Sequence, residues 1–95
     1  MLAPMKAVVF YYSAKDFMEK ARLHFPAHKA RLDAFHARGD LLAVGPWADP
    51  RDGAMAVFRS RNAAEEFVKD DPFLRQGVVE RYEIKEWNES LLGPA

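Results

Sequence analysis

The 95-residue sequence contains no cysteine. This absence excludes disulfide bonds, thiolate nucleophiles and cysteine-ligated metal sites, and it suits a chain that works in the reducing cytoplasm. A domain of this length buries a smaller share of its surface than a larger one, so its stability is marginal without added burial. Because no covalent cross-link is available, any extra stability has to come from packing.

The sequence also lacks an excess of charge of either sign, because 14 Lys and Arg balance 14 Asp and Glu. A balanced chain has no basic field of the kind that binds phosphate backbones, so nucleic acid is not an expected partner. No apolar run approaches the roughly 20 residues that a membrane-spanning helix needs, and the first residues do not resemble a secretion signal. We therefore expect a cytoplasmic protein that binds neither nucleic acid nor membranes.

Apolar residues are gathered into four short segments of strand type. These segments are rich in β-branched, aromatic and aliphatic side chains, and residues that favour turns bound them. The second and third are separated by the turn-rich run 48–53, which predicts a hairpin. The expected strands are 7–12, 41–47, 55–58 and 78–87.

Two helices are expected between these strands. A proline fits the first turn of a helix and disrupts the interior, so we expect a helix to begin at Pro26 and to end near Arg38. Ser60 can cap a second helix, which ends before Pro72 because the residue before a proline is pushed out of the helical region. Residues 73–77 are then expected to form a turn.

The resulting βαββαβ order predicts an α+β domain, with a four-stranded antiparallel sheet and both helices on one of its faces. Residues 1–95 form one domain in this prediction, with 88–95 as a short C-terminal tail. A sheet face in water shows alternating polarity, yet the first three strands are apolar at consecutive positions. We therefore expect a symmetric homodimer, packed sheet on sheet through the open face. The alternative is a monomer in which 13–25 and the tail cover that face.

His28 and Asp71 are the candidates for acid/base chemistry. His28 lies four residues before Leu32 and seven before Phe35, which turns it toward the buried side of its helix, near the first turn. Asp71 follows the negative end of a helix dipole, with its direction held by Pro72, so it needs a cationic or hydrogen-bonding neighbour. If His28 is that neighbour, the carboxylate orients an imidazole that can move protons. The alternative is an ordinary core histidine.

Three further side chains are candidates for contact with a small-molecule substrate. Ser13 ends the first strand and could orient a substrate oxygen, although its alternative role is that of a turn residue. Trp47 and Phe73 could wall an apolar pocket, or they could pack in a dimer interface.

No metal and no cofactor is expected. His24 and His28 have the i, i+4 spacing of a zinc pair, but Pro26 lies between them and no third ligand is near in the sequence. Gly45-Pro46 lacks the glycines and the lysine of a phosphate-binding loop, so it indicates only a turn at the end of a strand.

Three segments together resemble the YCII-related family: PAHKARL at 26–32, GDLLAVGP at 39–46 and DPFLRQGV at 71–78. Their order and separations match nearly end to end, and 84–87 fits the closing strand. The resemblance implies a ferredoxin-like domain that forms a dimeric α/β barrel, with an active site around a paired histidine and aspartate, here His28 and Asp71. The chain departs from the family pattern at Phe25, where a basic residue is common.

The resemblance covers several chemistries. One branch of the family is similar to dechlorinating enzymes that act on chlorinated hydroxyquinols, and sister families on the same barrel include lactone isomerases and small monooxygenases. The leading hypothesis is a cofactor-independent lyase, isomerase or hydrolase for a small aromatic or enolisable molecule, with His28 as general acid/base and Asp71 as its orienting partner. The alternative is a non-catalytic dimeric module for metabolite binding or interaction.

Overall fold

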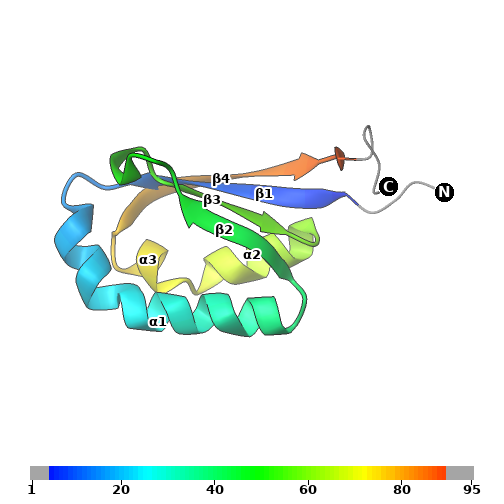
Figure 1. The fold of residues 1–95 in the computed structure, drawn as a ribbon, viewed down its shortest axis with the longest axis horizontal. Helices are drawn as coiled ribbons and strands as arrows, with labels where there is room; N and C mark the ends of the chain where they lie inside the picture. The colour runs from blue at the N-terminus through cyan, green and yellow to red at the C-terminus, as the bar shows by residue number, and fades with distance from the viewer. Residues whose placement is uncertain (1–4, 90–95) are drawn as a thin grey trace.

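The computed structural model describes residues 5–89. Its elements, in order, are β1 (Lys6–Ser13), α1 (Phe17–Ala37), β2 (Leu41–Pro46), the 3-10 helix η1 (Pro50–Asp52), β3 (Ala54–Phe58), α2 (Arg61–Lys69), α3 (Pro72–Arg75) and β4 (Val79–Trp87). The strands form one antiparallel sheet in the order β2-β3-β1-β4. The three α-helices lie on one face of it (Figure 1). The predicted α+β, ferredoxin-like fold is thereby confirmed, whereas most of the predicted tail, 90–95, lies outside the described residues.

The hydrophobic core lies between this sheet and the helices. Val9 of β1 pairs with Ala56 of β3, and both face the helix layer. Phe58 and the α2 residue Phe67 are almost fully enclosed, with ring centroids 5.2 Å apart. Burial of such aromatic side chains is the main favourable term in the folding of a domain this small. Ser60 caps α2 as predicted, because its hydroxyl accepts the Ala63 N–H at 3.1 Å.

Helix α1 does not begin at Pro26, as the sequence predicted, but runs without interruption from Phe17 to Ala37. Pro26 is exposed, so its ring does not enter the core, and the helix loses one backbone hydrogen bond there. Ala21 and Phe25, before the proline, line the same cavity as His28, after it. The packing of these side chains on one inward face outweighs the tendency of a proline to break a helix. As a result, His28 lies in the middle of the helix instead of its first turn.

The predicted turn at 73–77 is also different, because Pro72–Arg75 forms the short helix α3. Asp71 is the N-cap of this helix, and its carboxylate accepts the Phe73 N–H at 3.2 Å. A proline at the first helical position suits such a start. Asp71 therefore occupies a favourable helix N-terminus as well as following α2, which the sequence analysis did not foresee.

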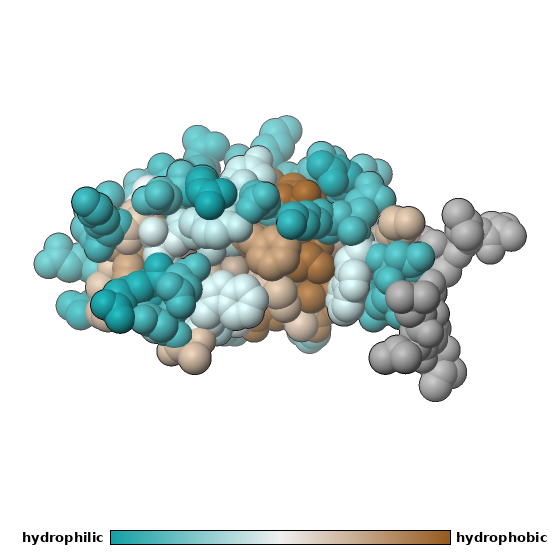
Figure 2. All heavy atoms as spheres, turned by 90° about the horizontal axis from the view of Figure 1, so that it is seen from above, coloured by the Kyte–Doolittle hydropathy of each residue, from teal (hydrophilic) through white to brown (hydrophobic). Residues whose placement is uncertain are grey.

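The face of the sheet opposite the helices is apolar in its middle. The strand register places Val8 and Phe10 of β1 there, next to Val57 and Met55 of β3. Figure 2 looks onto this face and shows apolar side chains gathered over its centre, with polar side chains around them. On β4 the same face carries charged residues: Arg81, Glu83 and Lys85.

The segment 13–25 does not cover this open face. Most of it belongs to α1, which lies on the opposite side of the sheet (Figure 1). The alternative of a monomer in which 13–25 and the tail shield the apolar strands is therefore wrong for 13–25. None of the helices in 5–89 is long and apolar enough to cross a membrane.

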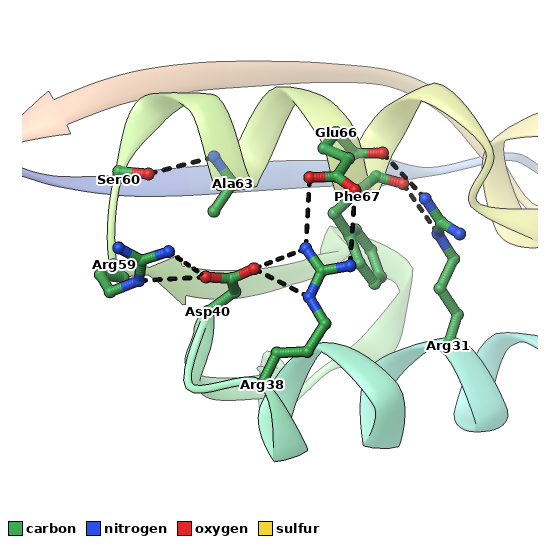
Figure 3. A network of polar contacts seen from close by, with 8 residues as sticks. All are labelled: Arg31, Arg38, Asp40, Arg59, Ser60, Ala63, Glu66 and Phe67. Atoms are coloured by element: carbon green, nitrogen blue, oxygen red, sulfur yellow. Dashed lines mark hydrogen bonds and ion pairs between the residues drawn. The ribbon is translucent and has the colours of Figure 1, made fainter.

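A cluster of ion pairs around Asp40 joins the end of α1 to β3 and α2 (Figure 3). Asp40 is buried, and it accepts hydrogen bonds from Arg59 and from Arg38, whose Nε lies 3.0 Å from its Oδ2. Arg38 also pairs with Glu66 at 3.2 Å, and Arg31 donates to the Glu66 backbone carbonyl at 2.8 Å. The guanidinium groups, Arg59 first and then Arg38, hold the pKa of the Asp40 carboxyl below its usual range. The cluster fixes the spacing of the two long helices at the end of the domain away from α3.

Candidate active site

A cavity of about 420 Å³ lies between α1 and the sheet. Its size falls in the range of about 300–1,000 Å³ that is typical of small-molecule pockets. Side chains of α1 that recur at helical spacing form one wall, and β1, β2 and β3 form the other. The strands offer small side chains here, those of Ala54 and Ala56, and the backbone of Gly45 also lines the cavity. The cavity therefore exists because small strand residues face the long helix.

Asp71 lies beside this cavity with no exposed surface, and three donors hold its carboxylate. Its Oδ1 lies 2.6 Å from Nδ1 of His28 and also accepts the Phe73 N–H. Its Oδ2 accepts the hydrogen bond that the Tyr11 phenol donates. A buried carboxylate is costly unless hydrogen bonds satisfy it, and here both oxygens are engaged. The orientation of Asp71 is thus fixed from β1, α1 and α3 at once.

The position of His28 follows from this carboxylate and from an aromatic contact. The imidazole lies parallel to the Phe73 ring, with centroids 3.7 Å apart and an interplanar angle of 3°. An ionised carboxylate only accepts hydrogen bonds, so Nδ1 carries the proton that faces Asp71. No other described residue hydrogen-bonds the second nitrogen, Nε2, and His28 is part of the cavity lining. Nε2 is therefore the ring atom left to exchange a proton with a ligand.

Tyr11 is a member of the site that sequence reasoning missed. Burial raises the pKa of its phenol far above the usual range, and the nearby Asp71 carboxylate raises it further. The phenol therefore stays protonated and acts as a donor to Asp71. A signal was present in the sequence, because Tyr11 alternates with Val9 and Ala7 on the inward side of β1, and a buried phenol needs a hydrogen-bond partner.

The remaining predicted residues lie in different places. Phe73 and Ser13 both line the cavity. The Ser13 hydroxyl donates to the Pro50 carbonyl at 2.7 Å, so it is already engaged in holding the loop after β2. Trp47 is not among the lining residues; it is 41% exposed, and its backbone N–H closes the β2–β3 hairpin by donating to the Gly53 carbonyl.

The polar residues of the site do not form a metal-binding group. Within residues 5–89, no three His, Asp or Glu side chains are clustered in a way that could hold a metal ion. The chemistry open to the described site is proton transfer by His28, supported by Asp71, inside an apolar enclosure.

Comparison with known proteins points to one family. The model of the YCII-related domain matches residues 5–88 of the chain. Two curated relatives, both named Protein YciI, come from Escherichia coli O6:H1 (strain CFT073) and Shigella flexneri. Each is 35% identical to this chain over 92 residues, which cover 85% of this chain and 94% of the relative.

A solved structure shares the fold. It is 5-chloro-2-hydroxyhydroquinone dehydrochlorinase (TftG) from Burkholderia phenoliruptrix AC1100, in complex with 2,5-dihydroxybenzoquinone. The TM-score is 0.75 over 94% of this chain and 99% of that chain, at 19% sequence identity. At this identity the likeness establishes the architecture, and the chemistry has to be argued from the residues of the present chain.

The three-donor environment of Asp71 predicts a specific cost for the loss of Tyr11. Tyr11→Phe leaves one buried carboxylate oxygen without its donor, so it should lower the free energy of unfolding by about 1–3 kcal/mol. Urea denaturation followed by circular dichroism measures the change. The matched control is Tyr82→Phe, because Tyr82 pairs with Tyr11 across the strands but is 44% exposed. The control should stay within about 0.5 kcal/mol, and equal effects of the two substitutions would contradict the description of the site.

Proposed function

The chain belongs to the YCII-related domain family, as the sequence resemblance predicted, and on this premise we propose that it is a cofactor-independent enzyme for a small molecule. His28 is the general acid/base of the proposal and Asp71 its positioning partner. The observation that carries the proposal is the 2.6 Å contact between His28 Nδ1 and a carboxylate with no exposed surface, at the wall of an apolar cavity.

The geometry supports proton transfer as the chemical step. Nε2 of His28 accepts a proton from an acidic O–H, or from a C–H next to a carbonyl, of the bound molecule. The imidazolium that forms is stabilised by the ionised Asp71, whose second oxygen stays bonded to Tyr11. The same proton is then returned to another atom of the substrate or to a leaving group, which completes an isomerisation or an elimination with all atoms accounted for. The apolar walls strengthen the ion pair because they exclude water.

Aromatic or enolisable compounds are the proposed substrate class. Their acidic hydrogens and delocalised anions suit a single histidine base, and a flat ring suits walls that contain Phe25 and Phe73. The structural relative described above is by name a dehydrochlorinase of a chlorinated hydroxyhydroquinone, which favours the same class. No side-chain nucleophile is needed, and the Ser13 hydroxyl is already bonded to a backbone carbonyl.

We further propose that the open face of the sheet packs against a second copy of the chain. Val8 and Phe10 lie at the apolar centre of this face, next to Val57 and Met55 of β3, and an apolar patch with a polar rim on an open sheet face is typical of an interface between proteins. Arg81 and Glu83 lie beside this centre on β4. A two-fold interface is self-complementary, so Arg81 of one copy can face Glu83 of the other, and the reverse. A dimer would also supply the burial that a chain of 95 residues lacks.

The acid/base assignment predicts loss of turnover in two single-residue variants. Purified protein is screened with chlorinated hydroquinones, other hydroxylated aromatics, lactones and keto acids. Turnover of any active compound should fall by about 10²–10⁴-fold in His28→Ala and in Asp71→Asn, with folding checked by circular dichroism. His36→Gln is the control, since His36 bonds the Leu41 carbonyl and is not part of the cavity lining. Full activity in either site variant would refute the assignment, and binding without turnover across the whole panel would favour the non-catalytic module.

The dimer proposal predicts a solution mass of twice the 10.8 kDa of one chain. Sedimentation equilibrium at micromolar concentration measures it. Phe10→Lys places a charge at the centre of the apolar face and should shift the protein to monomer. Leu23→Lys changes an apolar side chain that is 73% exposed on α1, away from that face, and should leave the mass unchanged. A monomeric wild-type protein would contradict the proposal.

A further inference from the structure

The polar side chains that line the cavity are almost all engaged with partners inside the chain. The Tyr11 phenol donates to Asp71, and the Ser13 hydroxyl donates to a backbone carbonyl of η1. Lys29, the only cationic side chain of the described lining, pairs its ammonium with Asp33 at 2.5 Å, one helical turn further on. That pair lies at the surface, since both side chains are more than half exposed. Within the described lining, Nε2 of His28 is the ring or carboxylate-type polar atom that has no hydrogen-bond partner in the chain.

An anionic group would find no unpaired cation in the described lining, because the Lys29 ammonium is paired with Asp33 at the surface. A carboxylate or phosphate that leaves water needs a cation or several donors to offset its lost hydration. The imidazole of His28 already faces the negative charge of Asp71, and Phe25 and Phe73 add apolar rings beside it, each with its centroid within 6.4 Å of the imidazole centroid. The residues that line the cavity, among those that the structure describes, therefore favour a ligand without formal charge.

The size and shape of the cavity indicate the size and shape of the ligand that it can hold. A volume of about 420 Å³ exceeds what a single small ring fills, and the lining is apolar over most of its surface. Phe73 stacks against His28, and the Phe25 ring centroid lies 6.4 Å from that of Phe73. Flat aromatic walls of this kind make their best contacts with a flat, delocalised ring system.

We propose that the site selects an uncharged, planar molecule of about two fused rings that presents one hydrogen-bonding hydroxyl to Nε2 of His28, and that it discriminates against carboxylates and phosphates. The proposal deepens the proposed function, because it takes His28 as the residue that meets the reacting group. Binding of an uncharged molecule in preference to an anion also favours the proposed proton transfer. When the hydroxyl gives up its proton, the new negative charge lies beside an imidazolium that Asp71 stabilises, so charge appears only in the step that is catalysed.

Three probes with the same ring system test each part of this proposal: 2-naphthol, naphthalene and 2-naphthoate. Dissociation constants are measured at about pH 8 by titration calorimetry, and the His28 ring resonances are followed by NMR. We expect 2-naphthol to bind about tenfold or more tightly than either of the others and to shift the His28 resonances. His28→Phe should remove the preference for 2-naphthol over naphthalene, whereas His36→Gln should retain it.

The outcomes separate this inference from the proposed function. Binding of 2-naphthoate as tight as that of 2-naphthol would overturn the exclusion of anions. Equal binding of naphthalene and 2-naphthol would overturn the role of the hydroxyl, and failure of all three to bind would overturn the ligand class. The binding measurements use no turnover, so any of these results can occur while His28→Ala still abolishes activity on another compound. Conversely, the expected binding pattern with full activity of His28→Ala would refute only the acid/base role.

Discussion

The buried carboxylate of Asp71 is the interaction on which the rest of the structure depends. A carboxylate with no exposed surface is stable only where donors surround it, and here they come from three different elements. Tyr11 reaches it from the central region of the sheet, His28 from the middle of the long helix, and the Phe73 N–H from the short helix that Asp71 itself caps. These elements cannot shift relative to one another without leaving part of the carboxylate unsatisfied.

The same constraint fixes the orientation of His28, which the proposed acid/base role requires. Its Nδ1 is committed to Asp71 and its ring is stacked on Phe73, so its remaining nitrogen has a fixed direction before any ligand arrives. Small strand residues leave an apolar space beside it, and the cluster around Asp40 holds the other end of the helix layer in place (Figure 3). A site of this kind has one reactive atom and little other polarity, which is why proton transfer on an uncharged, flat molecule fits it best.

Much of this arrangement could be predicted from local sequence, and the failures have physical causes. The spacing of His28 from Leu32 and Phe35 indicated its inward side, and Pro72 indicated a fixed direction for Asp71. The break expected at Pro26 is absent because packing on both sides of the proline outweighs one lost hydrogen bond. The cap role of Asp71 was missed because a four-residue helix looks like a turn. The cavity depends on Ala54 and Ala56 lying opposite α1 across the fold, a long-range arrangement that no local pattern reports.

The protonation state of the His28 ring tests the central claim most directly. Long-range ¹H–¹⁵N correlation spectra of the uniformly labelled protein distinguish the two neutral tautomers by the chemical shifts of their ring nitrogens. Orientation by Asp71 predicts that neutral His28 carries its proton on Nδ1 and that Asp71→Asn disturbs this preference, while His36 is unaffected. A neutral His28 protonated mainly on Nε2, or a tautomer that does not respond to Asp71→Asn, would contradict the claim that this buried carboxylate sets the chemistry of the site.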